Sequence, residues 1–362
     1  MIITLTIITI IYSLLILAFC YHWREEDSSC MDISSKQPLV SVIVAFRNEE
    51  KNLKALVESL LAQTYDRLEI ILIDDHSDDN SLSVAQSVSD SRIKIISAPD
   101  DIVGKKAALR LGYESSNGEI LFFTDADCIL DSRCIEATIG KMISEQCAMV
   151  CGPVRYANRK GFMQKIMQLE FLSLTGSGAS GFFMGRPFMC NGANFAVSRD
   201  VYAEADLNEK YSSGDDVFLL HYASKNHKVG FVQNQDCIVE TQGPRNISGF
   251  FAQRVRWASK AGGYKNPFAI FVSALIFLMS LSLLVAFVAG CVCQIYFIVF
   301  FCLLAMKLAV DTYFIIPVLR FYKQGRLWWA ILPLTLLHPL YIACVALTSL
   351  IYKPSWKGRK IK

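Results

Sequence analysis

Three short acidic clusters stand out because their side chains could bind a metal ion or move a proton. Asp74 to Asp79 follow an apolar run, and so does Asp125-Ala126-Asp127. A third pair, Asp215-Asp216, opens a segment with helical spacing. In an Asp-x-Asp sequence the two carboxylates can converge on one hard divalent cation and leave positions for water and phosphate oxygens. The alternatives are a turn or helix cap for Asp125 to Asp127 and a helix N-cap for the third pair.

The segments between these clusters predict the elements that hold them. Short apolar strands are expected at 39–46, 69–74, 93–97 and 119–124, and helices at 49–63, 104–116 and 131–145. This alternation predicts an α/β fold with a mostly parallel sheet and helices on both faces. Ligands of such sheets bind at the carboxyl ends of the strands, where the first two clusters lie.

Composition indicates a membrane protein. Apolar residues make up 53% and charged residues 19% of the 362, with a mean hydropathy of +0.34. In soluble chains about 45–50% of the residues are apolar and about 25% are charged. Four apolar runs are each long enough to span a bilayer: 1–23, 267–289, 291–319 and 328–351. The predicted organisation is an N-terminal transmembrane anchor at 1–23, a catalytic domain at 37–265, a membrane region of about three apolar segments at 266–351 and a basic tail at 352–362.

The N-terminal run is expected to be a retained anchor. No Lys or Arg precedes it, so the basic region of a signal peptide is missing. Leu17-Ala18-Phe19-Cys20 is a poor lipoprotein signal, since Phe19 is large.

The positive charge lies in the apolar part of the chain. Residues 266–362 hold nine Lys or Arg and one acid, whereas residues 1–265 hold 27 basic and 32 acidic residues. This distribution suits a membrane surface and argues against a nucleic-acid groove, which needs its basic stripe on the folded domain. The basic segments 320–326 and 353–362 cannot both be cytoplasmic if one ordinary span separates them. Pro333 and Pro339 interrupt that span, so a re-entrant hairpin is a hypothesis.

Two further features concern the membrane and its sides. Lys307 and Asp311 lie four residues apart in the third run, which predicts a paired couple facing the helix bundle, with a substrate contact as the alternative. The twelve cysteines form no CxxC pair, which excludes a paired zinc pattern. Scattered cysteines favour reduced thiols and a cytosolic face over a disulfide framework.

Taken together, the motifs resemble those of membrane-bound family 2 glycosyltransferases with the GT-A fold, a Rossmann-like α/β fold. The matching segments, in the family's order, are Ser41–Glu50, Ser59–Tyr65, Asp74–Asp79, Gly104–Leu109, Asp125–Asp127, Asp215-Asp216 and the QxxRW motif of Gln253, Arg256 and Trp257. QxxRW with flanking apolar runs narrows the resemblance to integral-membrane members, such as polysaccharide synthases and ceramide glucosyltransferases. The departures are Ala45, His76 and Asp215, the last of which replaces a usual Glu.

The resemblance implies a nucleotide-sugar donor site. Asp75, or less favourably Asp74, accepts a hydrogen bond from the uracil of a UDP-sugar. Asp127, helped by Asp125, holds Mn²⁺ or Mg²⁺, which offsets the charge of the nucleoside diphosphate leaving group.

Three further residues are expected at the donor: Lys105, Gln253 and Arg256. For Lys105 a solvated helix position is the alternative, and a P-loop is excluded because the upstream Gly spacing and a following Ser or Thr are missing.

The resemblance also implies a catalytic base and an acceptor site. Asp216, with Asp215 beside it, is expected to take the proton of an acceptor hydroxyl in a single inverting displacement. Trp257 is expected to shape the acceptor site, although an interfacial Arg/Trp anchor is its alternative. Asn191 and Asn194 could bind acceptor hydroxyls or form a structural turn. The segment 175–185, with four Gly, is expected to be a loop.

The predicted function is metal-dependent inverting transfer from a nucleotide sugar to a lipid or lipid-linked glycan. The catalytic domain is expected on the cytoplasmic side of a membrane, and the compact architecture suits a bacterial cell membrane. A processive polysaccharide synthase is the alternative enzyme, and a non-catalytic membrane scaffold that keeps the fold is the alternative of another class. A dehydrogenase is disfavoured because no GxGxxG follows the first strand.

Overall fold

The computed structural model describes residues 1–23, 37–207, 211, 214–351, 355–356 and 359–360. The chain divides into two compact units. The helical unit comprises Met1–Arg24, Asn158–Phe188 and Gly243–Ile361, and the sheet unit comprises Glu25–Ala157 and Met189–Gln242. The expected single domain at 37–265 therefore differs from the structure, in which 158–188 and 243–265 belong with the apolar helices.

The sheet unit is built on seven strands in the order β3-β2-β1-β4-β8-β6-β9. Their bounds are β1 Val40–Phe46, β2 Leu68–Asp74, β3 Ile93–Ser97, β4 Ile120–Phe123, β6 Met149–Cys151, β8 Phe195–Ser198 and β9 Val229–Phe231. Only β8 runs antiparallel to its neighbours in this sheet. The predicted mostly parallel α/β fold is confirmed, and the first four strands lie within one residue of their predicted bounds.

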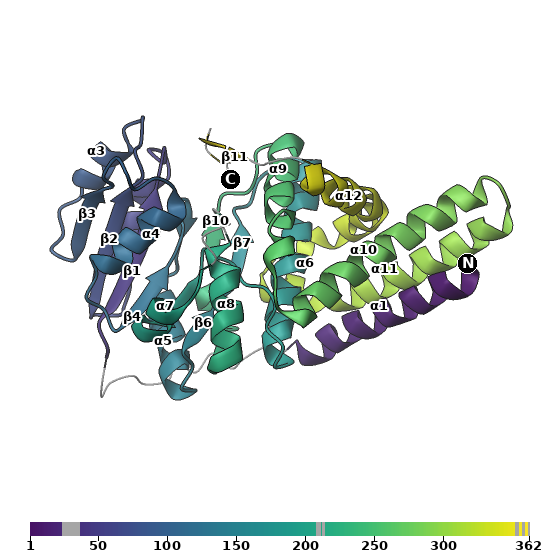
Figure 1. The fold of residues 1–362 in the computed structure, drawn as a ribbon, viewed down its shortest axis with the longest axis horizontal. Helices are drawn as coiled ribbons and strands as arrows, with labels where there is room; N and C mark the ends of the chain where they lie inside the picture. The colour runs from purple at the N-terminus through teal and green to yellow at the C-terminus, as the bar shows by residue number, and fades with distance from the viewer. Residues whose placement is uncertain (24–36, 208–210, 212–213, 352–354, 357–358, 361–362) are drawn as a thin grey trace. The chain divides into compact units, whose positions relative to one another are not determined.

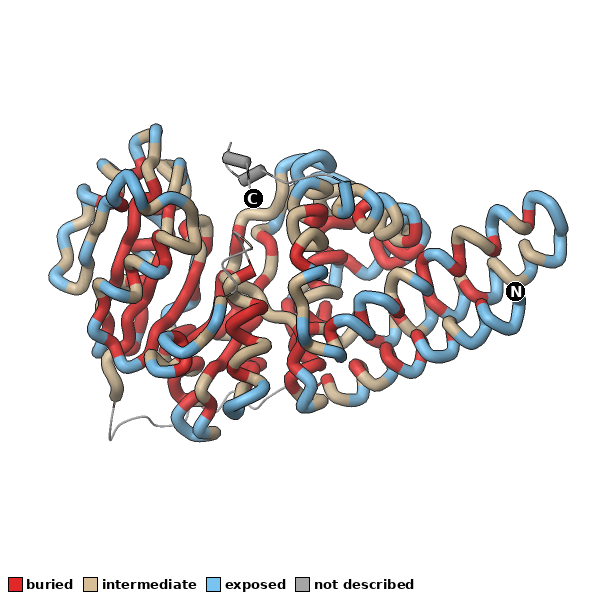
Figure 2. Tube along the Cα trace, in the orientation of Figure 1, coloured by how far each residue is buried: buried red, intermediate tan, exposed pale blue. Residues whose placement is uncertain are grey.

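Helices and a second, three-stranded sheet complete this unit. The helices are α2 Leu53–Leu61, α3 Ser81–Gln86, α4 Lys105–Glu114, α5 Cys134–Ser144, α7 Arg199–Glu204 and α8 Asp215–Asn226, with the short η1 Gln235–Cys237. The small sheet has the order β5-β10-β7, with β5 Cys128–Ile129, β7 Val154–Tyr156 and β10 Val239–Thr241. The central strands are buried along their length (Figure 2), as expected for a sheet covered on both faces.

A glycine sets how closely α4 approaches the sheet. A Cβ atom at Gly112 would lie 2.6 Å from Ile43 Cγ2 and 2.7 Å from Ile73 Cδ1. A larger residue would push the helix away from β1 and β2. Gly112 thereby allows the C-terminal part of α4 to pack closely on the sheet.

The helical unit contains four helices long and apolar enough to cross a membrane among the described residues. They are α1 Ile2–His22, α10 Pro267–Gly290, α11 Ile295–Phe321 and the segment Gly325–Ile351, which combines η3 Gly325–Ala330 with α12 Ile331–Ile351. The unit also holds α6 Phe162–Phe183, α9 Ile247–Ala258, η2 Ala261–Gly263 and the short strands β11 Ser355–Trp356 and β12 Arg359–Lys360.

Side-chain contacts define the directions of three of these helices, which lie side by side (Figure 1). Tyr12 meets Asp311, and the ring of Trp23 lies 5.7 Å from that of Phe321, so α1 and α11 are parallel. Thr9 contacts Met279 of α10. Only four residues separate the end of α10 from the start of α11, so α10 runs antiparallel to α11 and therefore also to α1. The end of α1, the end of α11 and the start of α10 therefore lie together.

The last apolar run is a single helix, so the hairpin expected at 328–351 is wrong. Pro333 lies in the first turn of α12, where a missing N–H costs little, and Pro339 lies inside the helix. Figure 1 shows α12 nearly end-on, whereas α1, α10 and α11 lie in the plane of view. The helix therefore crosses those three rather than running beside them.

The Gly-rich segment 175–185 is also not the expected loop, because most of it belongs to α6. A Cβ atom at Gly176 would lie 2.8 Å from Val318 Cγ2 of α11. Small residues let helix backbones approach closely, which is the usual reason for their presence in packed apolar helices. Gly176 therefore serves helix packing, whereas Gly185 follows the end of α6 with φ of 67°.

The predicted pairing of Lys307 with Asp311 is confirmed, and it includes a third group. Both side chains are buried, with exposed fractions of 3% and 11%, and they form an ion pair within α11. Tyr12 Oη donates to Asp311 Oδ1 at 2.7 Å, and Lys307 Nζ donates to Tyr12 Oη at 3.0 Å. The triad fixes the register of α1 on α11.

Replacing one member of this triad should leave an unpaired buried charge. We expect Lys307→Met to destabilise the protein by about 3–5 kcal/mol, seen as a lower melting temperature in detergent. The double variant Lys307→Met/Asp311→Leu removes both charges and should recover most of that loss. The exposed Lys323→Met is the control; a single variant that melts like this control would contradict the structural role of the pair.

Candidate active site

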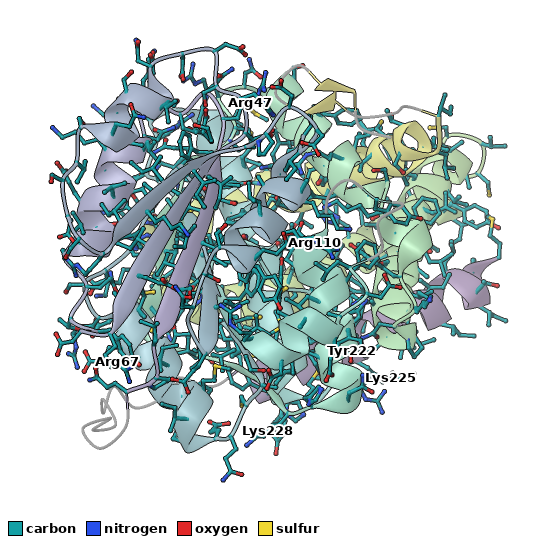
Figure 3. The ribbon with its side chains drawn as sticks, turned by 60° about the vertical axis from the view of Figure 1, so that its left-hand side comes forward. Arg47, Arg67, Arg110, Tyr222, Lys225 and Lys228 are labelled. Atoms are coloured by element: carbon teal, nitrogen blue, oxygen red, sulfur yellow. The ribbon has the colours of Figure 1, made fainter. Side chains whose placement is uncertain are left out.

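The carboxyl edge of the sheet gathers the residues that follow β1, β2 and β4. The parallel register places Phe46 beside Asp74 and Ile43 beside Phe123. Figure 3 shows Arg47 at this edge and Arg67 at the opposite one. The acidic clusters after β2 and β4 therefore both lie at the carboxyl-end edge of the sheet, as predicted.

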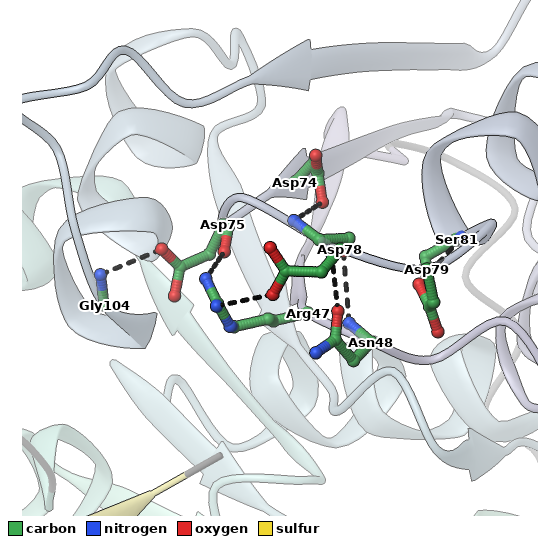
Figure 4. Close-up of polar contacts among 9 residues, drawn as sticks. Arg47, Asn48, Asp74, Asp75, Asp78, Asp79, Ser81 and Gly104 are labelled. Carbon is green, nitrogen blue, oxygen red and sulfur yellow. Dashed lines mark hydrogen bonds and ion pairs between the residues drawn. The ribbon is translucent and has the colours of Figure 1, made fainter. Parts of the chain in front are cut away.

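The cluster after β2 is a tightly bonded loop (Figure 4). Asp74 Oδ1 accepts from the backbone N–H of Ser77 at 3.1 Å, and Arg47 donates to the Asp75 carbonyl at 3.0 Å and to Asp78 Oδ2 at 2.9 Å. His76 has φ of 55°, a left-handed conformation that produces the sharp turn. These bonds give Asp74 a structural role in this loop.

Asp75 links this loop to α4. Its Oδ1 accepts from the backbone N–H of Gly104 at 3.0 Å, and the residue is 1% exposed. Gly104 has φ of 100° and precedes the first residue of α4, Lys105. The contact of Asp75 with a donor base stays a prediction, and its observed bond positions the helix that carries Lys105.

Lys105 lies among three carboxylates. Its ammonium forms an ion pair with Asp125. Burial lowers the pKa of Lys105, but the charges of Asp125, Asp215 and Asp216 outweigh that effect and raise it. The structure therefore brings together four residues that the sequence assigned to the donor site and to catalysis, from three separate parts of the chain.

Asp215 and Asp216 occupy the first turn of α8. Gly214, with φ of 94° in the left-handed region, precedes them and turns the chain into the helix. The unpaired N–H groups of a helix N-terminus favour negative charge at these positions. The N-cap alternative for this pair is wrong, because Gly214 is the cap and the two carboxylates belong to the first turn of α8; their catalytic role stays a prediction.

The second Asp of the DxD sequence has the electrostatics of a metal ligand. Burial raises the pKa of Asp127 to about 6, helped by the charges of Asp125 and Glu49. Its Oδ1 accepts from Thr241 at 3.2 Å. A divalent cation would relieve this repulsion between oxygen ligands, so Asp125 and Asp127 fit Mn²⁺ or Mg²⁺. Among the described residues no three His, Cys, Asp or Glu side chains converge, so the donor phosphates and water would complete the coordination.

The segment 190–194 lies against Asp216. A Cβ atom at Gly192 would be 3.2 Å from Asp216 Oδ2, so only a small residue allows this approach. Asn191 Oδ1 accepts from the backbone N–H of Ala193 at 3.0 Å, which forms a turn, and the side chain stays half-buried. Its acceptor contact remains a prediction beside that structural role.

The expectation for Asn194 is wrong. Its residue is fully buried, and its Nδ2 donates to the carbonyls of Pro153 at 3.0 Å and Cys237 at 2.8 Å. Buried backbone carbonyls need hydrogen-bond donors, and the Asn194 amide supplies them. A fully buried side chain with these bonds does not bind an acceptor sugar. Asn194 therefore holds the small sheet against β8.

The QxxRW motif lies on α9 of the helical unit. Gln253, Arg256 and Trp257 are half-buried, whereas Arg254 between them is buried. The roles expected for the first three stay predictions. The helix itself begins at Asn246, whose side chain accepts from Gly249 N–H at 2.8 Å as an N-cap.

Sequence reasoning missed several residues of the site. Arg47 fixes the loop after β2, Glu49 adds charge near Asp127, and Thr241 bonds Asp127 from 114 residues away. The first two stand in the segment that matched the family's opening strand, which was a usable signal. Thr241 offered none, since its partner is set only by the pairing of β10 with β5.

Comparisons with known proteins agree with this geometry. Residues 41–205 match the family described as Glycosyl transferase family 2. The probable glycosyltransferase YdaM of Bacillus subtilis is 24% identical over 246 residues, which are 65% of this chain and 56% of the relative. The cholesterol galactosyltransferase of Borreliella burgdorferi is 27% identical over 209 residues, 54% of this chain and 58% of the relative. The chain thus spans somewhat over half the length of these curated relatives.

A solved structure shares the fold over nearly the whole chain. The mannosyltransferase PcManGT from Pyrobaculum calidifontis, in complex with GDP-Man and Mn²⁺, superposes with a TM-score of 0.62 at 17% identity, covering 97% of this chain and 98% of its own. The likeness confirms the GT-A-type fold together with its helices. Residues 41–205 of this chain are thus similar to the family described as Glycosyl transferase family 2.

Proposed function

We propose that the protein transfers a sugar, with inversion, from a nucleotide-sugar donor to a lipid or lipid-linked acceptor at a membrane surface. The observation that carries this proposal is the ion pair of Lys105 with Asp125, the first residue of the DxD pair, with the charges of Asp215 and Asp216 acting on the same ammonium. That arrangement combines charge for a diphosphate with a carboxylate for a proton, which are the two requirements of a single displacement.

The donor end of the site is supported by charge and by the fold. Asp125 and Asp127 would hold Mn²⁺ or Mg²⁺, which supplies charge stabilisation to a diphosphate leaving group. Lys105 would bind a phosphate oxygen once Asp125 turns to the metal, and Arg256 and Gln253 are further donor candidates. PcManGT was solved with a nucleotide sugar and Mn²⁺, a precedent for this fold. A uracil contact at Asp75 makes a UDP-sugar our proposed donor.

Asp216 is the proposed general base. As the acceptor oxygen bonds to the anomeric carbon, the bond from that carbon to the nucleoside diphosphate breaks and the hydroxyl proton passes to the carboxylate. Gly192 lies directly against Asp216, so the adjacent Asn191 is suitably placed to meet the acceptor hydroxyls. Trp257 is the proposed stacking surface for a sugar or lipid.

The membrane placement follows from the helix directions. The end of α1, the start of α10 and the end of α11 share one end of the bundle, and Lys265, Arg320 and Lys323 lie at that end. The opposite end, with Met1 and residues 291–294, carries no Lys or Arg. Positive charge marks the cytoplasmic side. The sheet unit follows α1 in the chain, so we propose that catalysis takes place in the cytoplasm.

Metal dependence gives a direct test. We expect Asp127→Asn to weaken Mn²⁺-dependent binding of a nucleoside diphosphate by about 10–100-fold, since loss of a ligand should cost at least what loss of its supporting residues does. Binding is measured by calorimetry with Mn²⁺, Mg²⁺ or EDTA. Asp200→Asn, at an exposed position of α7, is the matched control. Turnover at the full rate in EDTA would contradict the metal role.

The base is tested separately from the donor site. Asp216→Asn should lower turnover by about 10²–10⁴-fold, because the variant cannot accept the proton. Donor affinity should change little, since the amide keeps the shape of the carboxylate. Steady-state kinetics with Asp200→Asn as control measures both quantities. Normal turnover would remove Asp216 from this role.

The acceptor class is tested by nucleoside diphosphate release from detergent-purified protein. Each common nucleotide sugar is supplied with and without a total lipid extract. Release from one UDP-sugar that requires both metal and lipid is the expected result. A long polymeric product would instead indicate a processive synthase, and nucleotide binding without release would indicate a scaffold.

A further inference from the structure

Arg254, which follows Gln253 in the QxxRW motif, is more deeply buried than the other cationic residue of α9, Arg256. The Arg254 side chain is 3% exposed, and its partner Glu170 on α6 is 5% exposed. Arg254 Nε donates to Glu170 Oε1 at 3.0 Å and to Oε2 at 3.2 Å, and Nη2 also contacts Oε2. This fork-to-carboxylate geometry is the strongest form of the pair.

A third helix joins the pair. Tyr341 of α12 donates from Oη to Glu170 Oε1 at 3.0 Å, and its ring lies 5.5 Å from that of Phe250 on α9. The network therefore ties α6, α9 and α12 of the helical unit. Because α12 is apolar enough to lie in a membrane, the orientation of α9 depends on a membrane helix.

Arg254 also touches two of the three motif residues. Its Nη1 donates to Gln253 Oε1 at 2.6 Å, and its guanidinium lies 4.3 Å from the centre of the Trp257 ring. The Phe250 ring stacks on it as well, at 4.6 Å. A planar guanidinium can bond to a carboxylate at its edge and stack on rings at its face, which an ammonium cannot do.

Packing alone does not require this arrangement. Desolvating two charges is costly, and an apolar pair of similar size often holds helices equally well. The specific result of the buried ion pair is that the guanidinium plane is fixed, and with it the side chains of Gln253 and Trp257.

We propose that Arg254, oriented by Glu170 and Tyr341, is a positioning residue that sets Trp257 for the acceptor. The inference rests on the proposed function and adds to it a residue outside the three that define QxxRW. It assigns to α6 and α12 the task of holding the motif in its active geometry.

The test compares Arg254→Lys, Glu170→Gln and Tyr341→Phe with Arg326→Lys, an exposed Arg of the same unit. Arg254→Lys keeps the charge but loses the fork and the stack. We expect it to lower kcat/KM for the acceptor by about 10²-fold, the usual cost of a misplaced substrate-binding group. Mn²⁺-dependent nucleotide affinity should fall much less than this, since the lost contact is the stack on Trp257 and a lysine can still donate to Gln253. Tyr341→Phe keeps the ion pair and should show a smaller loss of the same kind.

A double-mutant cycle separates positioning from general destabilisation. Arg254→Lys combined with Trp257→Phe should cost less than the sum of the two single losses, because both remove the same arrangement. Additive losses, or acceptor kinetics of Arg254→Lys equal to those of Arg326→Lys, would overturn the inference. If Arg254→Lys fails to fold, Tyr341→Phe replaces it in the cycle with Trp257→Phe, and the same comparison of single and double losses tests the inference. Absence of transfer by the unmodified protein would overturn the proposed function, and this inference with it.

Discussion

Repulsion between carboxylates is the constraint on which the sheet unit depends. Asp125 and Asp127 follow β4, Asp215 and Asp216 add their charge at Lys105, and like charges at short range are unfavourable unless a cation compensates them. Lys105 supplies that compensation in the protein itself. Its position is set by the bond between Asp75 and Gly104, and α4 packs closely on the sheet at Gly112. The same repulsion makes the site receptive to a divalent cation and its diphosphate.

The helical unit also contains buried charges that need a partner. Lys307 with Asp311, and Arg254 with Glu170, are buried pairs, and each carries additional hydrogen bonds from a tyrosine on another helix. Because a buried charge tolerates only a satisfied geometry, such pairs fix helix register more narrowly than apolar packing does. One pair sets α1 on α11, and the other sets the QxxRW helix on α6 and α12.

Local sequence signals predicted the parts of the protein that depend on local physics. The apolar strand at 93–97 was found at its observed bounds, and the four apolar runs became four long helices. Hydrophobic period and run length are properties of neighbouring residues, so they can be read without the fold. The loop expected at 175–185 and the hairpin expected at 328–351 failed because Gly and Pro disfavour an isolated helix. Packing against Val318 and the apolar surroundings reversed those preferences.

Local patterns and motif order were enough to predict the fold class and to identify the acidic residues at the strand ends. Only the tertiary structure decided which of them act together: that Lys105 meets Asp125, Asp215 and Asp216, that Asn194 is committed to backbone carbonyls, and that Arg254 is the buried member of its motif. The physical reason is that burial and charge pairing join residues far apart in the chain, such as Tyr12 and Asp311, which are 299 positions apart. Their energies depend on distance and solvent exposure, which no local pattern encodes.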